Sequence, residues 1–151
     1  MASEANAGKS AVGSKVTPSY QRPLPVVDEV SRFFWTSGAD GRLRVLRCDA
    51  CRAWVHPPQP VCFRCHNQTL SPQATAGQGR IYSFTINVQP WGVGLPVPYV
   101  IAIVTLDEDP GIQIMTNIVG VDPASVAIGQ RVRVIFQQDE DVWLPSFTPI
   151  D

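Results

Sequence analysis

The second half of the chain alternates apolar and polar residues with a two-residue period. The clearest case is RIYSFTINV at 80–88, where serine, threonine and asparagine separate the apolar residues. Such alternation predicts a strand with one buried face. The residues expected on that face are Tyr82, Phe84, Ile86 and Val88. YVIAIVTL at 99–106 is almost continuously apolar, which is typical of a strand covered on both faces.

Three more strands and a short helix are expected after residue 111. Ile112, Ile114 and Ile118 keep phase in IQIMTNI, and RVRVIF and VWLPSF predict the last two strands. Between IQIMTNI and RVRVIF, the segment DPASVAIG offers Asp122 as a cap, a proline at the first helical position and a glycine as the stop, which predicts the short helix. Three strands, a helix and two strands are the succession of a five-stranded OB-type barrel. The alternative is a small SH3-like barrel, which would not need the helix.

The first half of the chain predicts a helix followed by a strand. DEVSRFFWTS at 28–37 begins with two acids and spaces its apolar residues along one face, with Asp28 as the cap and Gly38 as the stop. Its aromatic residues, at 33–35, lie on more than one side. They therefore fit either packing against a neighbouring domain or contact with another protein. GRLRVLRC at 41–48 predicts a strand that leads into the first cysteine pair.

The four cysteines form two C-x-x-C pairs separated by ten residues: Cys48, Cys51, Cys62 and Cys65. A C-x-x-C turn aims two sulfurs at one point, and two such turns complete the tetrahedral sulfur set that zinc prefers. With every position filled by thiolate, no site stays open for a substrate or an activated water. The spacing therefore predicts a structural zinc in a ribbon.

Parts of this cysteine segment also match other kinds of site. Cys62 to His66 matches the C-x-x-C-H pattern of haem attachment, which would leave the first pair unexplained. A thioredoxin-like centre would also use one pair only, and disulfides need an oxidising compartment. His56 or His66 could replace a sulfur as a ligand, although four cysteines suffice. A rubredoxin-like iron site has the same sulfur set.

Composition supports a mostly β protein of one compact domain, or of a barrel with a smaller appendage. Of 151 residues, 44% are hydrophobic and 17% charged, and 14 prolines with 11 glycines favour turns over long helices. We expect an N-terminal helix, a rubredoxin-like zinc ribbon and a five-stranded OB-fold barrel. The expected divisions are a flexible tail at 1–26, the helix at 27–40, the ribbon at 41–70 and the barrel at 71–151.

The N-terminal residues and the apolar stretches bear on location. Residues 1–15 are small and polar and lack the apolar core of a secretion signal, which predicts a cytoplasmic chain. The most apolar stretch, 91–106, is interrupted by glycines and prolines and is shorter than the roughly 20 residues that cross a bilayer. No membrane partner is therefore expected.

Charge and residue types argue against two function classes. Residues up to Cys65 carry a formal charge of +4 and the later ones −5, with only three arginines in the barrel segment. Phosphate would be repelled over much of that barrel, so single-stranded nucleic-acid binding, a common use of both folds, is the alternative rather than the expected function. After His66 there is no histidine, cysteine or lysine. Catalysis by this chain alone therefore looks poor, and no catalytic residue is assigned.

In combination, several segments resemble one family. From about residue 20 onward the chain is similar to the zinc-ribbon/OB-fold accessory proteins, long catalogued as a domain of unknown function, that accompany thiolase-like and lipid-transfer-protein-like acyl-CoA enzymes. The segments that carry the resemblance are FFW at 33–35, G-x-L at 41–43, CDAC at 48–51, CFRC at 62–65, GQGRIYSFT at 77–85, PYVIAIVTLDE at 98–108, IGQRVRVIF at 128–136 and LPSFTP at 144–149.

The resemblance implies a non-catalytic subunit that binds and steadies an enzyme of acyl-CoA or steroid side-chain metabolism and helps to form its acyl-CoA channel. The complex would be an acyl-CoA lyase (aldolase) or an acyltransferase, with a CoA ester as its ligand. The residues expected to contact the partner or CoA, from their position, charge and aromatic character, are Phe33, Phe34, Trp35, Arg80, Trp91, Arg131 and Arg133.

Overall fold

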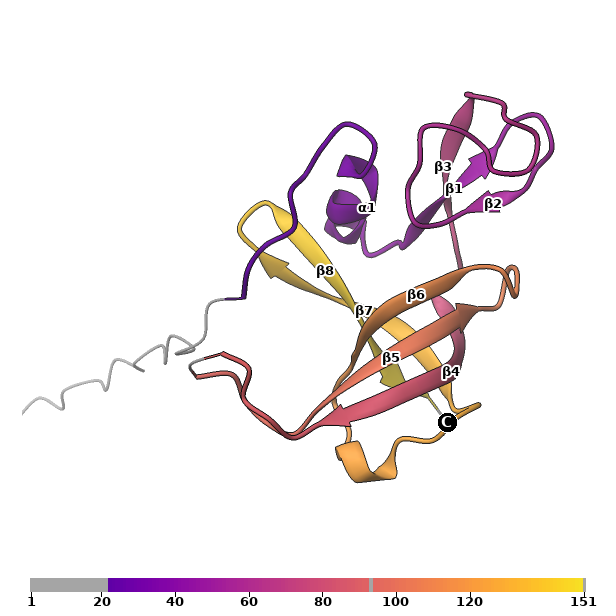
Figure 1. Ribbon diagram of the computed structural model, residues 1–151. Coiled ribbons are helices and arrows are strands. Elements are labelled where there is room, and N and C mark those ends of the chain that lie inside the picture. Colours follow the sequence, from indigo (N-terminus) through magenta and orange to yellow (C-terminus); the bar gives the residue numbers. More distant parts are fainter. Residues whose placement is uncertain (1–21, 93, 151) are drawn as a thin grey trace, which may run out of the picture.

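The computed structural model describes residues 22–92 and 94–150. The first 21 residues of the tail expected at 1–26 lie outside the described residues. Figure 1 shows two β structures side by side, a small three-stranded sheet and a barrel, with the helix α1 between them and near strand β8. The mostly β fold expected from the sequence is confirmed.

The small sheet is the ribbon that carries the cysteines. Its strands are β1 (Arg44–Cys48), β2 (Trp54–Val55) and β3 (Leu70–Ala74), and β1 pairs antiparallel with both neighbours. Val45 is buried in the main core, whereas the next residue, Leu46, is buried in a second cluster with Cys48, Val55 and Cys62. Strand β1 is therefore covered on both faces, which explains why Leu46 is out of phase in the sequence.

The barrel closes in the order β4-β5-β6-β8-β7. Its antiparallel strands are joined at one point by a parallel pair, in which Ile118 of β6 lies opposite Phe147 of β8. This arrangement confirms the five-stranded OB-fold barrel. Its strands are β4 (Gln78–Asn87), β5 (Tyr99–Leu106), β6 (Gln113–Ile118), β7 (Arg131–Asp139) and β8 (Val142–Pro149).

Two of the expected strand faces differ from the structure. A β-bulge between Ile81 and Ser83 shifts the phase of β4, so Ile81 is buried and Tyr82, expected inside, is 60% exposed. The extra residue of a bulge is left unpaired, so the alternation of inward and outward side chains shifts by one position across it. In β5, buried residues alternate with half-buried ones. Its outer face is thus only partly covered, although the sequence predicted cover on both faces.

The helices are shorter than expected. α1 spans only Arg32–Thr36 and continues as the 3₁₀ helix η1 (Ser37–Asp40). The N-cap position of α1 is Ser31 rather than Asp28, and Asp28 caps the turn that precedes the helix. Its carboxylate accepts hydrogen bonds there from the backbone and hydroxyl of Ser31, 2.7 and 2.6 Å away. Gly38 is not the stop. A Cβ there would lie 2.6 Å from Phe136 and Trp143, so this glycine permits close packing on the barrel.

The helix expected between the third and fourth barrel strands is a single 3₁₀ turn, η2 (Pro123–Ser125). Its cap was predicted correctly, because the Asp122 carboxylate accepts a hydrogen bond of 3.0 Å from the N–H of Ala124. Gly129 lies beyond the turn with a φ of +83°, and Val126, directly after the turn, is extended, so the segment connects β6 to β7 without an α-helix.

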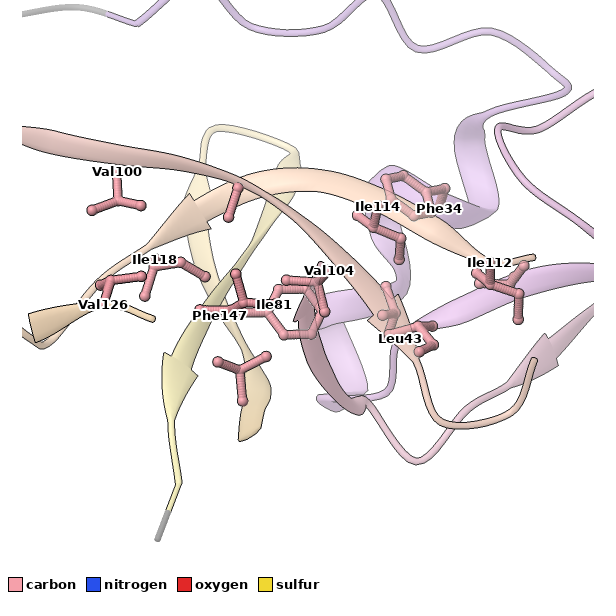
Figure 2. Packing of buried hydrophobic residues seen from close by; sticks show 14 residues of the cluster. Phe34, Leu43, Ile81, Val100, Val104, Ile112, Ile114, Ile118, Val126 and Phe147 are labelled. Carbon is pink, nitrogen blue, oxygen red and sulfur yellow. The ribbon is translucent and has the colours of Figure 1, made fainter. Parts of the chain in front are cut away.

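One hydrophobic core unites the barrel with the segment before the ribbon (Figure 2). Phe147 is completely buried among barrel residues such as Ile81 and Val104. Phe34 of α1 and Leu43, just before β1, belong to the same cluster. The N-terminal helix and the first ribbon strand are therefore fixed to the barrel by apolar burial.

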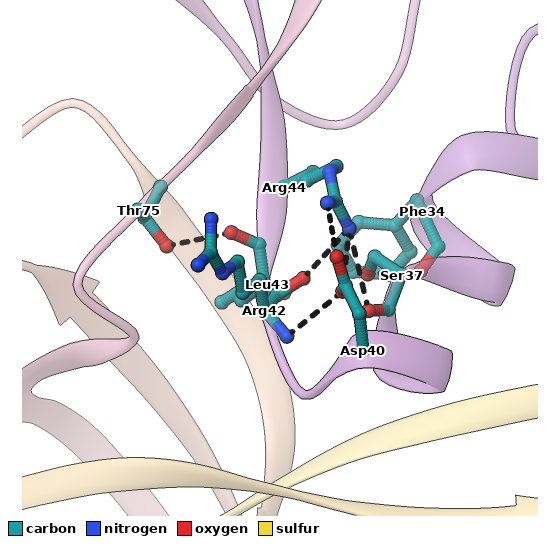
Figure 3. A network of polar contacts seen from close by, with 7 residues as sticks. All are labelled: Phe34, Ser37, Asp40, Arg42, Leu43, Arg44 and Thr75. Carbon is teal, nitrogen blue, oxygen red and sulfur yellow. Dashed lines mark hydrogen bonds and ion pairs between the residues drawn. The ribbon is translucent and has the colours of Figure 1, made fainter.

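A polar network fixes the turn from η1 into β1 (Figure 3). Arg44 forms a two-pronged ion pair with Asp40, with N–O distances of 2.5 and 2.9 Å. On the other side, the Thr75 hydroxyl donates to the carbonyl oxygen of Leu43 at 2.9 Å. The hydrogen bond from Arg44 lowers the pKa of the Asp40 carboxyl to about 2.

We expect Arg44→Gln to return the pKa of Asp40 toward its ordinary value of about 3.9, because the main charge partner is lost. The pair stabilises the fold above the ordinary carboxyl pKa, and this contribution is lost as pH falls through about 2. An NMR pH titration of the Asp40 side chain measures the shift. Arg42→Gln is the control and should change the pKa much less, because the Arg42 side chain acts only through its charge and the variant keeps the backbone N–H that donates to the Asp40 carboxylate. Equal shifts in both variants would contradict the assignment.

Candidate metal centre and apolar groove

The four cysteines meet at one point of the ribbon. Their sulfurs all lie within 4.8 Å of one another, with 3.5 Å between Cys48 and Cys65 and 3.7 Å between Cys51 and Cys62. Four sulfurs placed tetrahedrally around zinc at about 2.3 Å would be about 3.8 Å apart. The set therefore fits a tetrahedral metal ion with four thiolate ligands.

Two matching turns produce this geometry. The carbonyl oxygen of Cys48 accepts from the N–H of Arg52 at 3.0 Å, and that of Cys62 accepts from His66 at 2.9 Å. Arg52 and His66 both have positive φ angles, 63° and 59°. Each C-x-x-C pair is thus closed into a turn by the same hydrogen bond, donated by the residue that follows the second cysteine.

The backbone around the sulfurs favours thiolate at two positions. The N–H of Cys51, assisted by that of Ala50, lowers the pKa of Cys48 to about 7. The N–H groups of Cys65 and Arg64 lower the pKa of Cys62 in the same manner. At Cys65 the N–H of Asn67 acts in that direction too, but the neighbouring cysteines and burial raise the pKa to about 12. Four adjacent thiolates therefore need a cation, which a bound metal supplies.

Neither histidine belongs to the metal cluster. Among the described residues, the group that could hold a metal ion consists of the four cysteines, and all four are free of disulfides. His66 is exposed and His56 packs its ring against Phe34, with 5.2 Å between ring centres. The sulfurs therefore complete the ligand set, and a closed set of this kind stabilises the ribbon but leaves no position for substrate.

A groove on the barrel was not foreseen in the sequence. One cavity, of about 380 Å³, lies where α1, the His56–Pro58 segment and strands β6 and β8 meet. Its walls are mostly apolar and include Trp35, Pro57 and Leu144. A second cavity, of about 500 Å³, continues over β6 and β5 toward Leu95 and Tyr99.

The two cavities adjoin each other, because they share part of their lining. Both include Met115, Asn117 and Arg22, and the Arg22 guanidinium donates to the side-chain oxygen of Asn117 at 3.4 Å. We call the two adjoining cavities together the β6 groove. Elongated, apolar and with few polar groups, it has the character of a site for a hydrophobic ligand.

His56 lines the β6 groove as a neutral ring. Burial lowers its pKa to about 4, and its Nδ1 atom is buried without a hydrogen-bond partner. The only feature of the sequence that marks His56 is the pair Pro57 and Pro58 directly after it, which lines the same cavity. Met115 had a clearer signal, since an apolar residue stands at a position of IQIMTNI that alternation assigns to the outer face.

We expect stability to fall as pH drops from about 6.5 to about 4, because the unfolded chain protonates His56 in this range and the folded state does not. The full effect is on the order of 3 kcal/mol. Denaturant unfolding of the wild type and His56→Phe at several pH values checks it. Acid also protonates the thiolates in both proteins, so the difference between the two curves is the measurement. Parallel curves would contradict the buried neutral ring.

The expected contact residues fall in three places. Phe34 is buried in the core, while Phe33 and Trp35 are half-buried against it, and Phe34 and Trp35 also line the groove. Trp91 is 78% exposed at the tip of the β4–β5 hairpin. The sequence did not indicate that these aromatic residues would belong to different surfaces.

The three barrel arginines gather on the β4–β7 edge, and none lines the β6 groove. Arg80 lies opposite Arg131, and their guanidinium groups have partners within the chain. Arg131 pairs with Asp107 at 2.8 Å, and Arg80 donates to the carbonyl oxygen of Gly129 at 3.0 Å. Arg133 is exposed. Two of the three guanidinium groups, those of Arg80 and Arg131, therefore already interact with groups of this chain.

A ribbon with four clustered thiols followed by a closed five-stranded barrel defines a zinc-ribbon/OB-fold protein. Two family models match it consecutively. The ChsH2 rubredoxin-like zinc ribbon domain matches residues 35–71, and the ChsH2 C-terminal OB-fold domain matches residues 72–137. In the part of the chain that the structure describes, no helix has the length and apolar character needed to cross a membrane.

The chain belongs to the DUF35 family. It superposes on the solved structure of an Ltp2-ChsH2(DUF35) aldolase with a TM-score of 0.76 and 32% identity, covering 83% of this chain and 98% of that one. It is 33% identical over 133 residues (87% of this chain, 41% of the relative) to a probable enoyl-CoA hydratase alpha subunit of Thermomonospora curvata.

A second curated relative is the 3-oxo-4,17-pregnadiene-20-carboxyl-CoA hydratase alpha subunit of Mycobacterium tuberculosis, 33% identical over 117 residues (78% of this chain, 37% of the relative). The chain thus spans about two fifths of the length of these two relatives.

Proposed function

We propose that this chain is a non-catalytic accessory subunit that binds and stabilises a thiolase-like or lipid-transfer-protein-like enzyme acting on acyl-CoA. The observation that carries the proposal is an apolar groove without catalytic machinery. The described groove lining holds three residues whose side chains can carry charge near neutral pH, His56, Arg22 and Asp28. The histidine is neutral and the aspartate hydrogen-bonds to Ser31, so the chemistry would come from the partner enzyme.

The β6 groove would form part of the partner's acyl-CoA channel. A mostly apolar wall suits an acyl chain or a fused-ring side-chain ester, and a neutral His56 adds no charge to that wall. The likeness to an aldolase complex and to a pregnadiene-carboxyl-CoA hydratase subunit supports a steroid side-chain CoA ester as substrate and aldol cleavage as the reaction.

The same cysteine site supports a structural zinc and bears on the cellular location. Four unpaired thiols at one point are kept for metal binding in a reducing compartment, which supports a cytoplasmic location. Zinc rather than iron would be its metal, because the family model that covers the cysteines is a zinc ribbon.

The test is a pull-down of the tagged chain from extracts of its own cells, with the retained proteins identified by mass spectrometry. A thiolase-like or lipid-transfer-like enzyme in fixed ratio is expected, and lyase activity on a steroid side-chain CoA ester should require the pair. Retention of nucleic acid in place of such an enzyme, with affinity that falls steeply with salt, would favour the alternative of a single-stranded nucleic-acid-binding protein.

A further inference from the structure

Three barrel strands come from a part of the chain almost without charge. Residues 81–106 contain no charged side chain, and neither do residues 110–121, although 17% of the whole chain is charged. These two stretches include most of β4 and all of β5 and β6. The charges of the barrel segment therefore lie on Arg80 at the start of β4, on β7, in the connecting turns and at residue 151.

The outer faces of these strands form one uncharged surface. In β5, Val100, Ala102 and Val104 are buried in the core, so Ile101 and Ile103 point outward and are half-buried. Ile103 lies opposite Met115 of β6, which is 75% exposed. The same face continues through these neighbours: Ser83, Thr85, Asn87, Tyr99, Thr105, Gln113 and Asn117. We call it the β4–β6 outer face.

This face is unusual for a surface left in water. The open side of an antiparallel sheet is ordinarily polar, whereas this one has an apolar centre of Ile101, Ile103 and Met115 inside a rim of uncharged, mostly polar residues. An apolar centre depleted of charge is the mark of a protein interface. The apolar run of β5 has the composition of a strand covered on both faces, yet its outer side chains are only half-buried within this chain. Within this chain, the outer face of β5 therefore lacks the packing partner that its apolar composition predicts.

Size and position favour another protein as that cover. At about 4.8 Å between strands and 3.3 Å per residue, three short strands cover on the order of 350 Å². The β6 groove and the β4–β5 hairpin extend this area toward the roughly 800 Å² per partner of a stable interface. Met115 belongs to both the face and the groove, so a protein seated here would also roof the groove.

Trp91 marks the far end of the same surface. The hairpin that carries it extends beyond the barrel (Figure 1). Its indole N–H donates to the side-chain oxygen of Asn87 at 3.0 Å, and the Asn87 amide in turn donates to the Tyr99 hydroxyl. An exposed tryptophan held in one orientation loses little freedom on binding, which is the character of an interface anchor.

We propose that the β4–β6 outer face, with Trp91 at its end, is where the partner enzyme docks, through a protein surface that is itself apolar and low in charge. This inference rests on the proposed function and adds its location. The partner would lie over Met115 and close the β6 groove into a channel. Nucleic acid does not fit this face, because the described residues offer phosphate no cation there beyond Arg22 and Arg80 at its borders, and Arg80 already donates to the carbonyl oxygen of Gly129.

The test is Met115→Glu, because a charge buried against an apolar partner without a counter-ion opposes binding. Affinity for the purified enzyme retained in the pull-down should fall about tenfold or more. Ile128→Glu is the matched control. It places the same charge at a residue that is 70% exposed on the loop before β7, and the affinity should stay within about twofold.

The outcomes separate the two proposals. If the wild type retains the enzyme and Met115→Glu retains it equally well, the docking surface is wrong and the accessory function stands. If the wild type retains no such enzyme, both fail. If Met115→Glu instead splits a dimer of the free chain and leaves enzyme binding unchanged, the face joins two copies and the proposal is overturned.

Met115 also provides a direct footprint, since it is the only methionine besides Met1. Dilute peroxide should convert the exposed thioether to sulfoxide quickly in the free chain and much more slowly in the complex, as measured by peptide mass spectrometry. Unchanged oxidation in the complex would contradict docking here. Slow oxidation in the free chain that becomes fast after removal of residues 1–21 would show that the chain's own N-terminal segment covers the face.

Discussion

Replacing Cys62 with serine is expected to abolish stoichiometric zinc binding and to unfold the ribbon. A serine hydroxyl is a poor substitute for the thiolate, and Cys62 is buried in the small cluster with Leu46 and Val55. Structural zinc contributes about 10–16 kcal/mol of apparent binding free energy in zinc-finger peptides, far more than such a small cluster supplies. Metal analysis should change from one zinc per chain to none.

The same change should destabilise the barrel. Leu43 and Val45 join the ribbon strand to the main core, so a loss on the order of 4 kcal/mol, or about 10 °C in melting temperature, is expected. His66→Ala is the control and should keep one zinc per chain, because His66 lies outside the sulfur cluster. Full zinc in Cys62→Ser, or loss of zinc in His66→Ala, would contradict the four-sulfur site.

Phe147→Ala is expected to lower the free energy of unfolding by about 3–5 kcal/mol. The ring is completely buried in the main core (Figure 2), and alanine would leave a cavity that the closed barrel cannot fill by collapsing. Phe147 also lies where β8 meets β6 in the parallel pair, its carbonyl oxygen accepting from the N–H of Val119 at 2.9 Å. Guanidinium unfolding followed by circular dichroism measures the change.

Phe63→Ala provides the matched control, because it removes the same ring from a side chain that is 65% exposed. A change within about 0.5 kcal/mol is expected there. Similar losses in the two variants would mean that burial of Phe147 does not determine barrel stability. A large loss confined to Phe147→Ala would support barrel closure at the β6–β8 pair.

The metal centre was predictable because it is built from local turns. Two residues between cysteines are enough to aim both sulfurs at one point, and in the structure the sulfurs of Cys48, Cys51, Cys62 and Cys65 lie within 4.8 Å of one another. The β6 groove was not predictable. Trp35, His56, Met115 and Leu144 are far apart in the sequence, and only the closed barrel and the packing of α1 bring them to one cavity.

The sequence by itself determined the order of strands, the sulfur ligands, the Asp122 cap and the mostly β fold, since each depends on spacing or side-chain chemistry within a few residues. The tertiary structure alone decided which side chains of each strand are buried. The bulge that turns Tyr82 outward, the second cluster that buries Leu46 and the half-exposed outer side of β5 all result from contacts between distant segments. Burial depends on those long-range contacts, and local periodicity does not contain them.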